Sequence, residues 1–499
     1  MPTAASLELI LPVVTPLACA GLYALPLPYR RRFADWAGLL TPVVTLTCAG
    51  LLVSRVTARG PVHAVGHLLR ADALTVWLLL VVGAVALIAV AASPAYLAGE
   101  RAAGRTGERT ARRYCLLVQG FLAAMTLGVL AENLGVLWVA IEATTIVTAF
   151  LVGHRRTRTS IEAAWKYVVL CSVGIALAFL GTILIYYAAR HAGLSEAAAL
   201  DWPTLAASAS RLDPDVTRIG IGLIVIGFGA KAGLIPLHAW LPDAHSQAPA
   251  PVSALMSGVL LSVAFSALLR YKTISDAALG PHYLRLLLAI AALLTLALAA
   301  AILLGQRDYK RMLAYSSMEH MSLIALGTAI GSRLAIAAVL LHIAGHGLAK
   351  AVAFCSAGQI LGWQHTSRIG RLRGLLLRAP GLGAGFGFAV IALLGMPPFS
   401  LFASEIGIAR AGFTARMGWP TTAALLLVLV AFAALAARTA RMLLGAPTAG
   451  PGAATVAHRI GAAAGLPLLA GLLACAALGI STGPLTPLLD TAAALIGGH

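Results

Sequence analysis

Apolar runs of about 20 residues recur along almost the whole chain, separated by short polar loops. Each run is long enough to cross the roughly 30 Å hydrocarbon core of a bilayer as a helix. Backbone N–H and C=O groups find no water in lipid, so spanning segments must satisfy them internally. With 11% charged residues among 499 and a mean hydropathy of +0.90, the chain is predicted to be an all-α polytopic membrane protein.

The runs and their loops predict fourteen transmembrane helices. The first run, residues 7–25, lacks a basic leader and a convincing cleavage site, so we expect it to be retained. Placing the N-terminus outside puts 21 basic residues in inside loops and 12 in outside loops, which predicts that both termini face outside. The net charge of +18 is scattered among these loops, which favours membrane topology over nucleic-acid binding. The spans are centred near residues 16, 45, 83, 121, 143, 174, 229, 260, 293, 321, 346, 398, 432 and 470.

The seventh and twelfth spans are predicted to be discontinuous. Ile235-Pro236-Leu237-His238 begins four residues after Lys231, and Met396-Pro397-Pro398-Phe399 precedes Glu405. Proline removes a backbone donor and breaks the helical hydrogen-bond ladder. Interrupted helices that carry charges at corresponding places in two halves are typical of inverted repeats, whereas a simple kink in a packed helix is the alternative.

Lysine is used sparingly, with five lysines against thirty-one arginines. Three of the five lie in apolar sequence: Lys166 near the start of 163–187, Lys231 in 219–237 and Lys350 in 334–361. An ionisable residue at membrane depth costs about 2.5–3.5 kcal/mol on insertion scales and is a functional-site hypothesis by default. A desolvated ammonium can release its proton, whereas a guanidinium cannot. The pattern therefore predicts proton handling inside the membrane.

Two groups of intramembrane residues are candidates for this role. Glu142 lies in an otherwise uncharged run, and we expect it to pair with Lys231, either as a proton switch or as a static ion pair between two helices. His342, His346 and Lys350 recur at i, i+4 and i+8, which stacks them on one helix face. A carboxylate further along the chain, at position 405, would supply a terminal acid for this row.

Metal binding is the alternative for the histidine pair, but no third ligand is evident beside it, so a proton relay is favoured. His63 and His67 lie in an outside loop and are expected to be solvated. Six dispersed cysteines without a C-x-x-C pair disfavour an iron–sulfur or zinc site. We therefore expect no cofactor and no metal in this chain.

Five segments together resemble the antiporter-like membrane subunits shared by respiratory complex I, Mrp-type sodium/proton antiporters and group 4 energy-converting hydrogenases. The resemblance covers residues 70–445. Three further motifs are most similar to the hydrogenase-4 and formate hydrogenlyase branch, and they make Lys166, Glu319 and His320 accessory candidates. These motifs are Glu142-Ala-Thr-Thr145, Ala163-Ala-Trp-Lys166-Tyr167 and Ser316-Ser-Met-Glu319-His320-Met321. The five segments are Trp138–Glu142, Ala230–Asp243, Pro251–Leu255, Asp308–Ser317 and His346–Lys350.

The resemblance implies a fourteen-helix core with a proton path along a central polar axis. By motif match, Glu142 and Lys231 take the paired acid and lysine roles, and Glu405 takes the terminal role. The row of His342, His346 and Lys350 matches the bridging residues, and His238 belongs to the same path. The eighth helix often carries a lysine or histidine where this chain has Ser257 and Ser262, so the link would run through hydroxyls and water.

The implied organisation has four parts. Residues 1–110 form helices 1–3, residues 111–275 a first five-helix repeat (helices 4–8), residues 276–445 an inverted second repeat (helices 9–13), and residues 446–499 a C-terminal helix 14.

The expected function is proton translocation as a subunit of a multisubunit membrane-bound oxidoreductase, in a bacterial or archaeal cytoplasmic membrane. Other membrane subunits and a peripheral redox arm would be the partners, and the arm would carry iron–sulfur clusters and nickel–iron, flavin or quinone chemistry. The alternatives are an Mrp-type sodium/proton antiporter subunit, a membrane subunit of an inorganic-carbon uptake complex, and a non-pumping scaffold.

Overall fold

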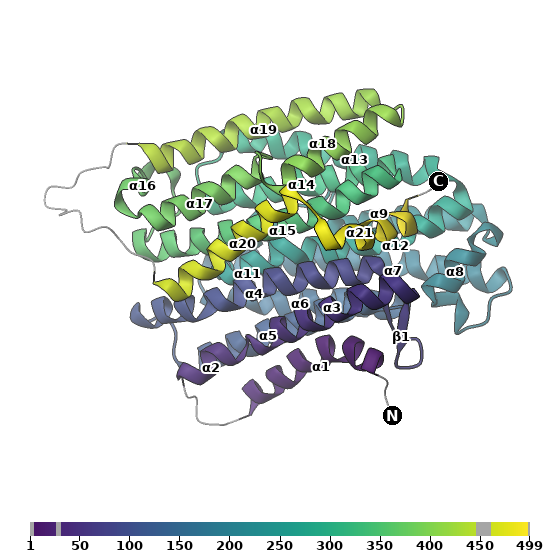
Figure 1. Cartoon of the computed structure of the whole chain (residues 1–499), viewed down its shortest axis with the longest axis horizontal. Coiled ribbons are helices and arrows are strands. Elements are labelled where there is room, and N and C mark those ends of the chain that lie inside the picture. Colours follow the sequence, from purple (N-terminus) through teal and green to yellow (C-terminus); the bar gives the residue numbers. More distant parts are fainter. Residues whose placement is uncertain (1–3, 26–30, 446–460, 498–499) are drawn as a thin grey trace, which may run out of the picture.

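Long helices run side by side along the long axis of the molecule (Figure 1). The computed structural model describes residues 4–25, 31–445 and 461–497. The N-terminal part contains α1 (Ala4–Ala24), α2 (Arg31–Ala37), α3 (Leu40–Arg59), an antiparallel hairpin of β1 (Val62–Ala64) and β2 (Leu69–Ala71), and α4 (Ala73–Ala102).

The middle part contains the broken seventh and the π-helical eighth span. Its helices are α5 (Glu108–Leu130), α6 (Leu134–Val152), η1 (Gly153–Arg155), α7 (Arg158–His191), η2 (Ala198–Leu200), α8 (Trp202–Ser208), η3 (Ala209–Arg211), α9 (Pro214–Lys231), α10 (Trp240–Gln247), α11 (Ala250–Leu255), the π-helical turn η4 (Met256–Leu260) and α12 (Leu261–Leu279). The last part consists of α13 (Pro281–Gly305), α14 (Tyr309–Ile330), α15 (Arg333–Gln364), η5 (Ile369–Arg371), α16 (Leu375–Arg378), α17 (Pro380–Leu393), α18 (Ser400–Thr414), α19 (Gly418–Leu444), α20 (Ala462–Ile480), η6 (Gly483–Leu485) and α21 (Thr486–Ile496).

Polar residues begin several of the long helices, where free N–H groups need acceptors. The Asp72 side chain accepts from the N–H of Thr75 at the start of α4, and Asn133 caps α6 in the same way. Asp308 and Ser332 do so for α14 and α15. Each cap marks the point where a loop passes into an apolar run.

Within the described residues, ten helices are long and apolar enough to cross a membrane, and α20 with α21 forms an eleventh candidate bent by 65°. The chain is therefore a multi-pass membrane protein. Among the other predicted spans, α9 and α14 contain three charged residues each, and α17 and α18 are short because that span is broken. The count of fourteen, the two repeats and the four-part division remain predictions.

Both predicted interruptions are present. The chain is non-helical between α9 and α10, where Gly233 has a φ of +84°, and between α17 and α18, where Gly395 has a φ of +61°. The C-terminal segment differs from the prediction of one helix, because α21 follows α20 after the sharp bend. Residues 446–460, the first part of that predicted segment, lie outside the described residues.

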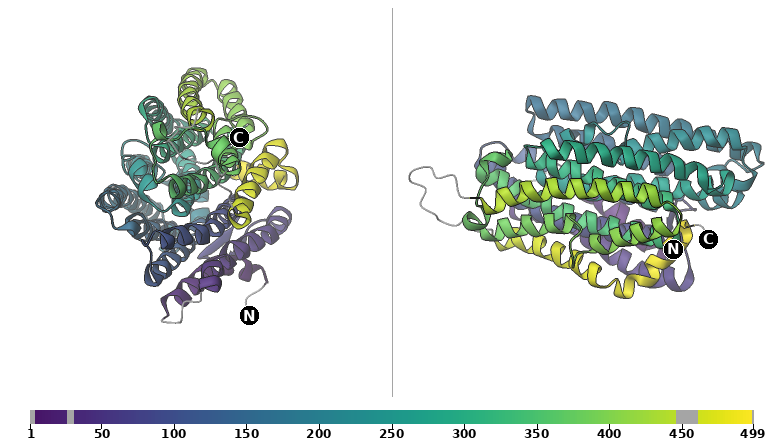
Figure 2. Two further views of the ribbon diagram at one scale, coloured as in Figure 1. Left: turned by 90° about the vertical axis from the view of Figure 1, so that its left-hand side faces the viewer. Right: turned by 90° about the horizontal axis from the view of Figure 1, so that it is seen from above.

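The loops predicted to face inside contact one another at one end of the bundle. Arg105 and Arg155 both contact Glu100 at one end, and Arg438 donates to the carbonyl of Gln306 at the same end. The β-hairpin and α8 lie at the opposite end, where α1 begins and α21 ends (Figures 1 and 2). The loops predicted to face inside therefore share one end of the molecule.

The bundle interior is formed by the eighth and eleventh spans. Every residue in the most apolar window of the segment from α11 to α12 is buried, and 94% of the corresponding window of α15 is buried. The two spans touch at glycines, because a Cβ atom added to Gly347 would lie 2.9 Å from the carbonyl oxygen of Gly258. Large apolar side chains such as Ile146, Trp165 and Leu426 are exposed on outer helices, as expected for a lipid-facing surface.

Candidate functional site

The break after α9 places a lysine in the protein interior. Lys231 is the last residue of α9 and is completely buried. Its ammonium donates hydrogen bonds of 2.6 Å to the hydroxyl of Thr145 on α6 and of 2.6 Å to the hydroxyl of Tyr167 on α7. Trp240, at the start of α10, donates its indole N–H to the carbonyl of Ala230 and so occupies one acceptor that the break leaves free. The lysine is thus held by neutral oxygens.

Glu142 does not contact Lys231 directly, which corrects the expected ion pair. The two residues interact electrostatically, but no nitrogen–oxygen contact within 4.0 Å joins these two described side chains. The Thr145 hydroxyl, three residues along α6, lies beside the Glu142 carboxylate and accepts a hydrogen bond from the lysine. One carboxylate oxygen of Glu142 is buried without a hydrogen-bond partner. Thr145 and Tyr167 lie in the motifs of the resemblance, but sequence reasoning gave neither of them a role.

The second cluster lies between α14 and α15. His342, His346 and Lys350 are all completely buried, and each contacts α14, as their spacing predicts. His320 on α14 lies 3.1 Å from His342, measured between ring nitrogens, and its ring centroid is 5.2 Å from that of His346. Lys350 donates to the carbonyl of Leu313 at 2.7 Å and to the hydroxyl of Ser316.

Two carboxylates lie near this cluster. Glu319 is buried, one of its oxygens has no hydrogen-bond partner, and it interacts electrostatically with Lys350 and Glu405. Glu405 on α18 packs against Gly395 in the break before that helix. Its carboxylate and ring nitrogens of His320 and His342 lie within 4.8 Å of one another. His320, His342 and Glu405 therefore form a set of three possible metal ligands, which the sequence did not reveal. His346, the other member of the histidine pair, is not part of this set.

Side chains of the eighth span and α10 lie beside the second cluster, and ring contacts from Tyr167 to Trp240 and from Trp240 to His245 lead to it from the first. Ser257 in the π-helical turn and Ser317 on α14 have their hydroxyl oxygens 2.6 Å apart. His245 on α10 is completely buried, and one of its ring nitrogens has no partner. It interacts electrostatically with both His346 and Lys350. Sequence reasoning missed His245, although it follows the motif ending at Asp243 by two residues.

Other candidate residues have less central positions. Ser262 is buried and its hydroxyl has no partner, while His238 is half-buried in the break after α9. Lys166 is exposed and forms ion pairs with Glu162 at 2.7 Å and Asp243 at 3.1 Å, so it does not belong to the buried interior that holds Lys231 and Lys350.

Two loop interpretations also need correction. Lys310 was counted as a loop cation but is buried, where it donates to the last carbonyls of the α10 segment, those of Ser246 and Ala248. His63 and His67 are not simply solvated, because both lie against the buried carboxylate of Glu132.

Comparison with known proteins identifies the family of this chain. Residues 131–432 match the family described as NADH:quinone oxidoreductase/Mrp antiporter, TM. A hydrogenase-4 component F homolog from Methylacidiphilum infernorum is 40% identical over 350 residues, which are 70% of this chain and 73% of the relative. An NADH-quinone oxidoreductase subunit N from Ectopseudomonas mendocina is 29% identical, covering 84% of this chain and 82% of the relative. A chain of the Mrp complex from a Dietzia species superposes with a TM-score of 0.86 at 22% identity, covering 99% of this chain and 98% of that one. The chain belongs to the family of transmembrane subunits found in NADH:quinone oxidoreductases and Mrp antiporters.

Proposed function

We propose that this chain translocates protons as a membrane subunit of a multisubunit oxidoreductase, with the redox chemistry located in partner subunits. The relatives named as a hydrogenase-4 component and an NADH-quinone oxidoreductase subunit support this assignment. Iron–sulfur clusters, and nickel–iron or flavin and quinone chemistry, would then belong to the partners.

The observation that carries the proposal is a matched arrangement in the two halves of the interior. Lys231 is bound by the hydroxyl of Thr145, and Glu142 lies three residues from that threonine. Lys350 is bound by the hydroxyl of Ser316, and Glu319 lies three residues from that serine. In both halves a buried ammonium thus has a carboxylate nearby that does not neutralise it by contact.

This arrangement suits proton transfer better than static support. A buried charge without a contacting partner is costly, and a lysine can relieve that cost by releasing its proton. A close ion pair would instead hold the charge in place. In the first half, the Thr145 hydroxyl lies beside both Lys231 and Glu142, and a hydroxyl can both donate and accept a hydrogen bond, which a relay requires.

Between the lysines, the proposed path runs through His245, the Ser257–Ser317 pair and the histidines of α14 and α15. Bound water would complete it, because water-bridged hydrogen bonds are nearly as favourable enthalpically as direct ones. Glu405 would be the terminal acid, and Ser262 and His238 would line the path. Inverted repeats, a cytoplasmic-membrane location and both termini outside complete the proposal.

Donor-driven proton flux in proteoliposomes containing the whole complex tests this function. Lys231→Met and Lys350→Met should each assemble, because an apolar side chain replaces a buried charge, and should abolish or strongly reduce pumping. Lys166→Met is the matched control, because that lysine is exposed, and it should pump normally. Normal proton-to-electron stoichiometry in both buried-lysine variants would mean that this chain is a non-pumping scaffold. Sodium-dependent proton flux without an electron donor would instead indicate an antiporter.

A further inference from the structure

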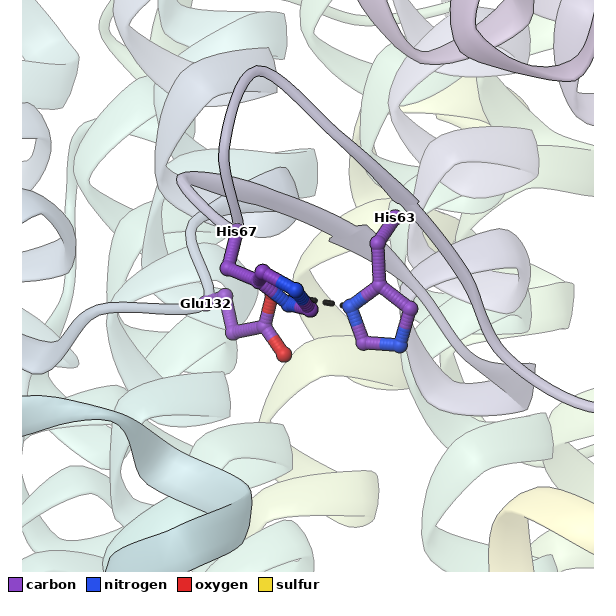
Figure 3. A group of neighbouring side chains, drawn as sticks. All are labelled: His63, His67 and Glu132. Atoms are coloured by element: carbon purple, nitrogen blue, oxygen red, sulfur yellow. Dashed lines mark hydrogen bonds and ion pairs between the residues drawn. The ribbon is translucent and has the colours of Figure 1, made fainter. Parts of the chain in front are cut away.

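Two histidines and a glutamate converge at the end of the bundle opposite the arginine-rich loops. His63 lies on β1, His67 lies in the turn that follows, and Glu132 lies between α5 and α6 (Figure 3). The Nδ1 atom of His63 is 2.9 Å from Oε2 of Glu132, and the Nδ1 atom of His67 is 3.6 Å from the same oxygen. One possible ligand atom from each of the three residues lies within 4.8 Å of those of the other two.

The hairpin is built to hold this arrangement. Val65, Gly66 and His67 all have φ between +54° and +66°, a left-handed run that folds the turn back and brings the second histidine beside the first. A β-branched residue in this region is a backbone outlier, and such conformations cluster at functional sites. The N–H of Glu132 donates to the carbonyl of Leu68 at 3.1 Å, which fixes the glutamate against the hairpin.

The carboxylate of Glu132 is oriented by its other oxygen. Its side chain is only 2% exposed, and Oε1 accepts from the guanidinium of Arg70 at 3.4 Å. That guanidinium also contacts Asp72 at 3.3 Å, so its positive charge is shared with a second carboxylate. Oε2 therefore faces the two imidazoles. Metal-binding carboxylates are commonly held by such an outer hydrogen bond.

The donor set and its spacing fit a first-row transition metal. Zinc bonds of about 2.0–2.2 Å in a tetrahedral arrangement separate neighbouring ligand atoms by about 3.3–3.6 Å. The His67 contact of 3.6 Å has this spacing, and the His63 contact of 2.9 Å is shorter. Imidazole with carboxylate suits Zn²⁺ or Co²⁺ better than Mg²⁺ or Ca²⁺, which prefer oxygen ligands. A hydrogen bond to Glu132 would need only one histidine. The second histidine, His67, has a side chain that is 72% exposed, and it nevertheless faces the same carboxylate oxygen.

We propose that His63, His67 and Glu132 bind one divalent transition-metal ion, Zn²⁺ or a similar cation, through Nδ1, Nδ1 and Oε2. Water would take the fourth position, because the histidines face solvent. The bound ion would join the hairpin to the segment that directly precedes α6, the helix that carries Glu142. This inference is independent of the proposed proton translocation and differs from the expectation that the chain binds no metal.

The test is metal titration of the purified, chelator-treated full chain in detergent. Co²⁺ should give the visible absorption of a tetrahedral site at one equivalent, and Zn²⁺ should displace it. His67→Ala and Glu132→Gln should each weaken Zn²⁺ binding at least tenfold. The His67 side chain is largely exposed and Gln keeps the shape of Glu, so neither change should disturb the fold, which circular dichroism would check. His282→Ala, an exposed histidine at the same end, is the control and should bind normally.

Two results would overturn the proposal. The first is the absence of a stoichiometric Co²⁺ or Zn²⁺ signal in the unaltered chain. The second is binding that persists in His67→Ala but disappears in His342→Ala, which would assign the ion to the interior set of His320, His342 and Glu405.

Discussion

Replacing Thr145 with valine should slow proton pumping without preventing assembly. Valine keeps the shape of threonine but removes the hydroxyl that accepts from Lys231 at 2.6 Å and lies beside Glu142. A hydrogen bond to a charged group contributes about 1.5–3 kcal/mol. If the same free energy is lost along the rate-limiting transfer, pumping falls by about 10- to 150-fold, since 1.36 kcal/mol corresponds to a factor of ten.

The neighbouring threonine provides a matched control. Thr144 is also completely buried, but its hydroxyl donates to the carbonyl of Ile141 in its own helix at 2.6 Å. Thr144→Val should therefore pump at close to the unaltered rate. Donor-driven proton flux and electron-transfer rate are measured together in proteoliposomes, and native gel electrophoresis reports assembly. Thr145→Ser, which restores a hydroxyl, should recover pumping.

The result is decisive in either direction. A Thr145→Val complex that assembles and pumps at the unaltered rate would refute the hydroxyl-bridged relay. Equal loss in the Thr144 and Thr145 variants would refute it as well, because the effect would then come from packing of α6. Loss in Thr145→Val with recovery in Thr145→Ser is the outcome that the geometry predicts.

Three further predictions concern the bridge, the broken helix and the topology. His245→Asn should reduce proton flux at least tenfold with assembly intact, because it removes the buried imidazole between the clusters; unaltered flux would exclude this residue from the path. Gly395→Ala should lower the free energy of unfolding by about 1–3 kcal/mol, because φ is positive there and the new Cβ atom meets the Glu405 carboxylate. Gly362→Ala, with open space around the new methyl group, should not, and equal melting temperatures would contradict the packing argument. Cysteines at Ala103 and Ala197, exposed at opposite ends, should react with an impermeant reagent in intact cells only at position 197, and the reverse pattern would invert the predicted orientation.

The class of the protein and the residues worth testing could be predicted from sequence. Long apolar runs and prolines at Pro236 and Pro397 act locally, so they predicted helices and both interruptions. The spacing of His342, His346 and Lys350 likewise predicted one helix face, since helical periodicity is a property of the segment itself. The resemblance added the family, which the comparison with residues 131–432 supports.

Contacts between helices were decided by tertiary structure. Glu142 and Lys231 were expected to pair, and only the packing of α6, α7 and α9 shows that Thr145 and Tyr167 accept hydrogen bonds from the lysine instead. Lys310 shows the same limit, because hydropathy assigned it to a loop while the end of α10 buries it.

The burial of a polar side chain depends on which elements pack over it, and those elements are distant in sequence. His63 and Glu132 are separated by 69 positions and meet because a hairpin folds against the turn before α6. His245 is buried because α10 packs against α7 and α14, and its ring also contacts that of Phe354 on α15. Sequence periodicity carries the local helix and strand geometry, whereas the surroundings of a charge arise when separate helices pack and exclude water.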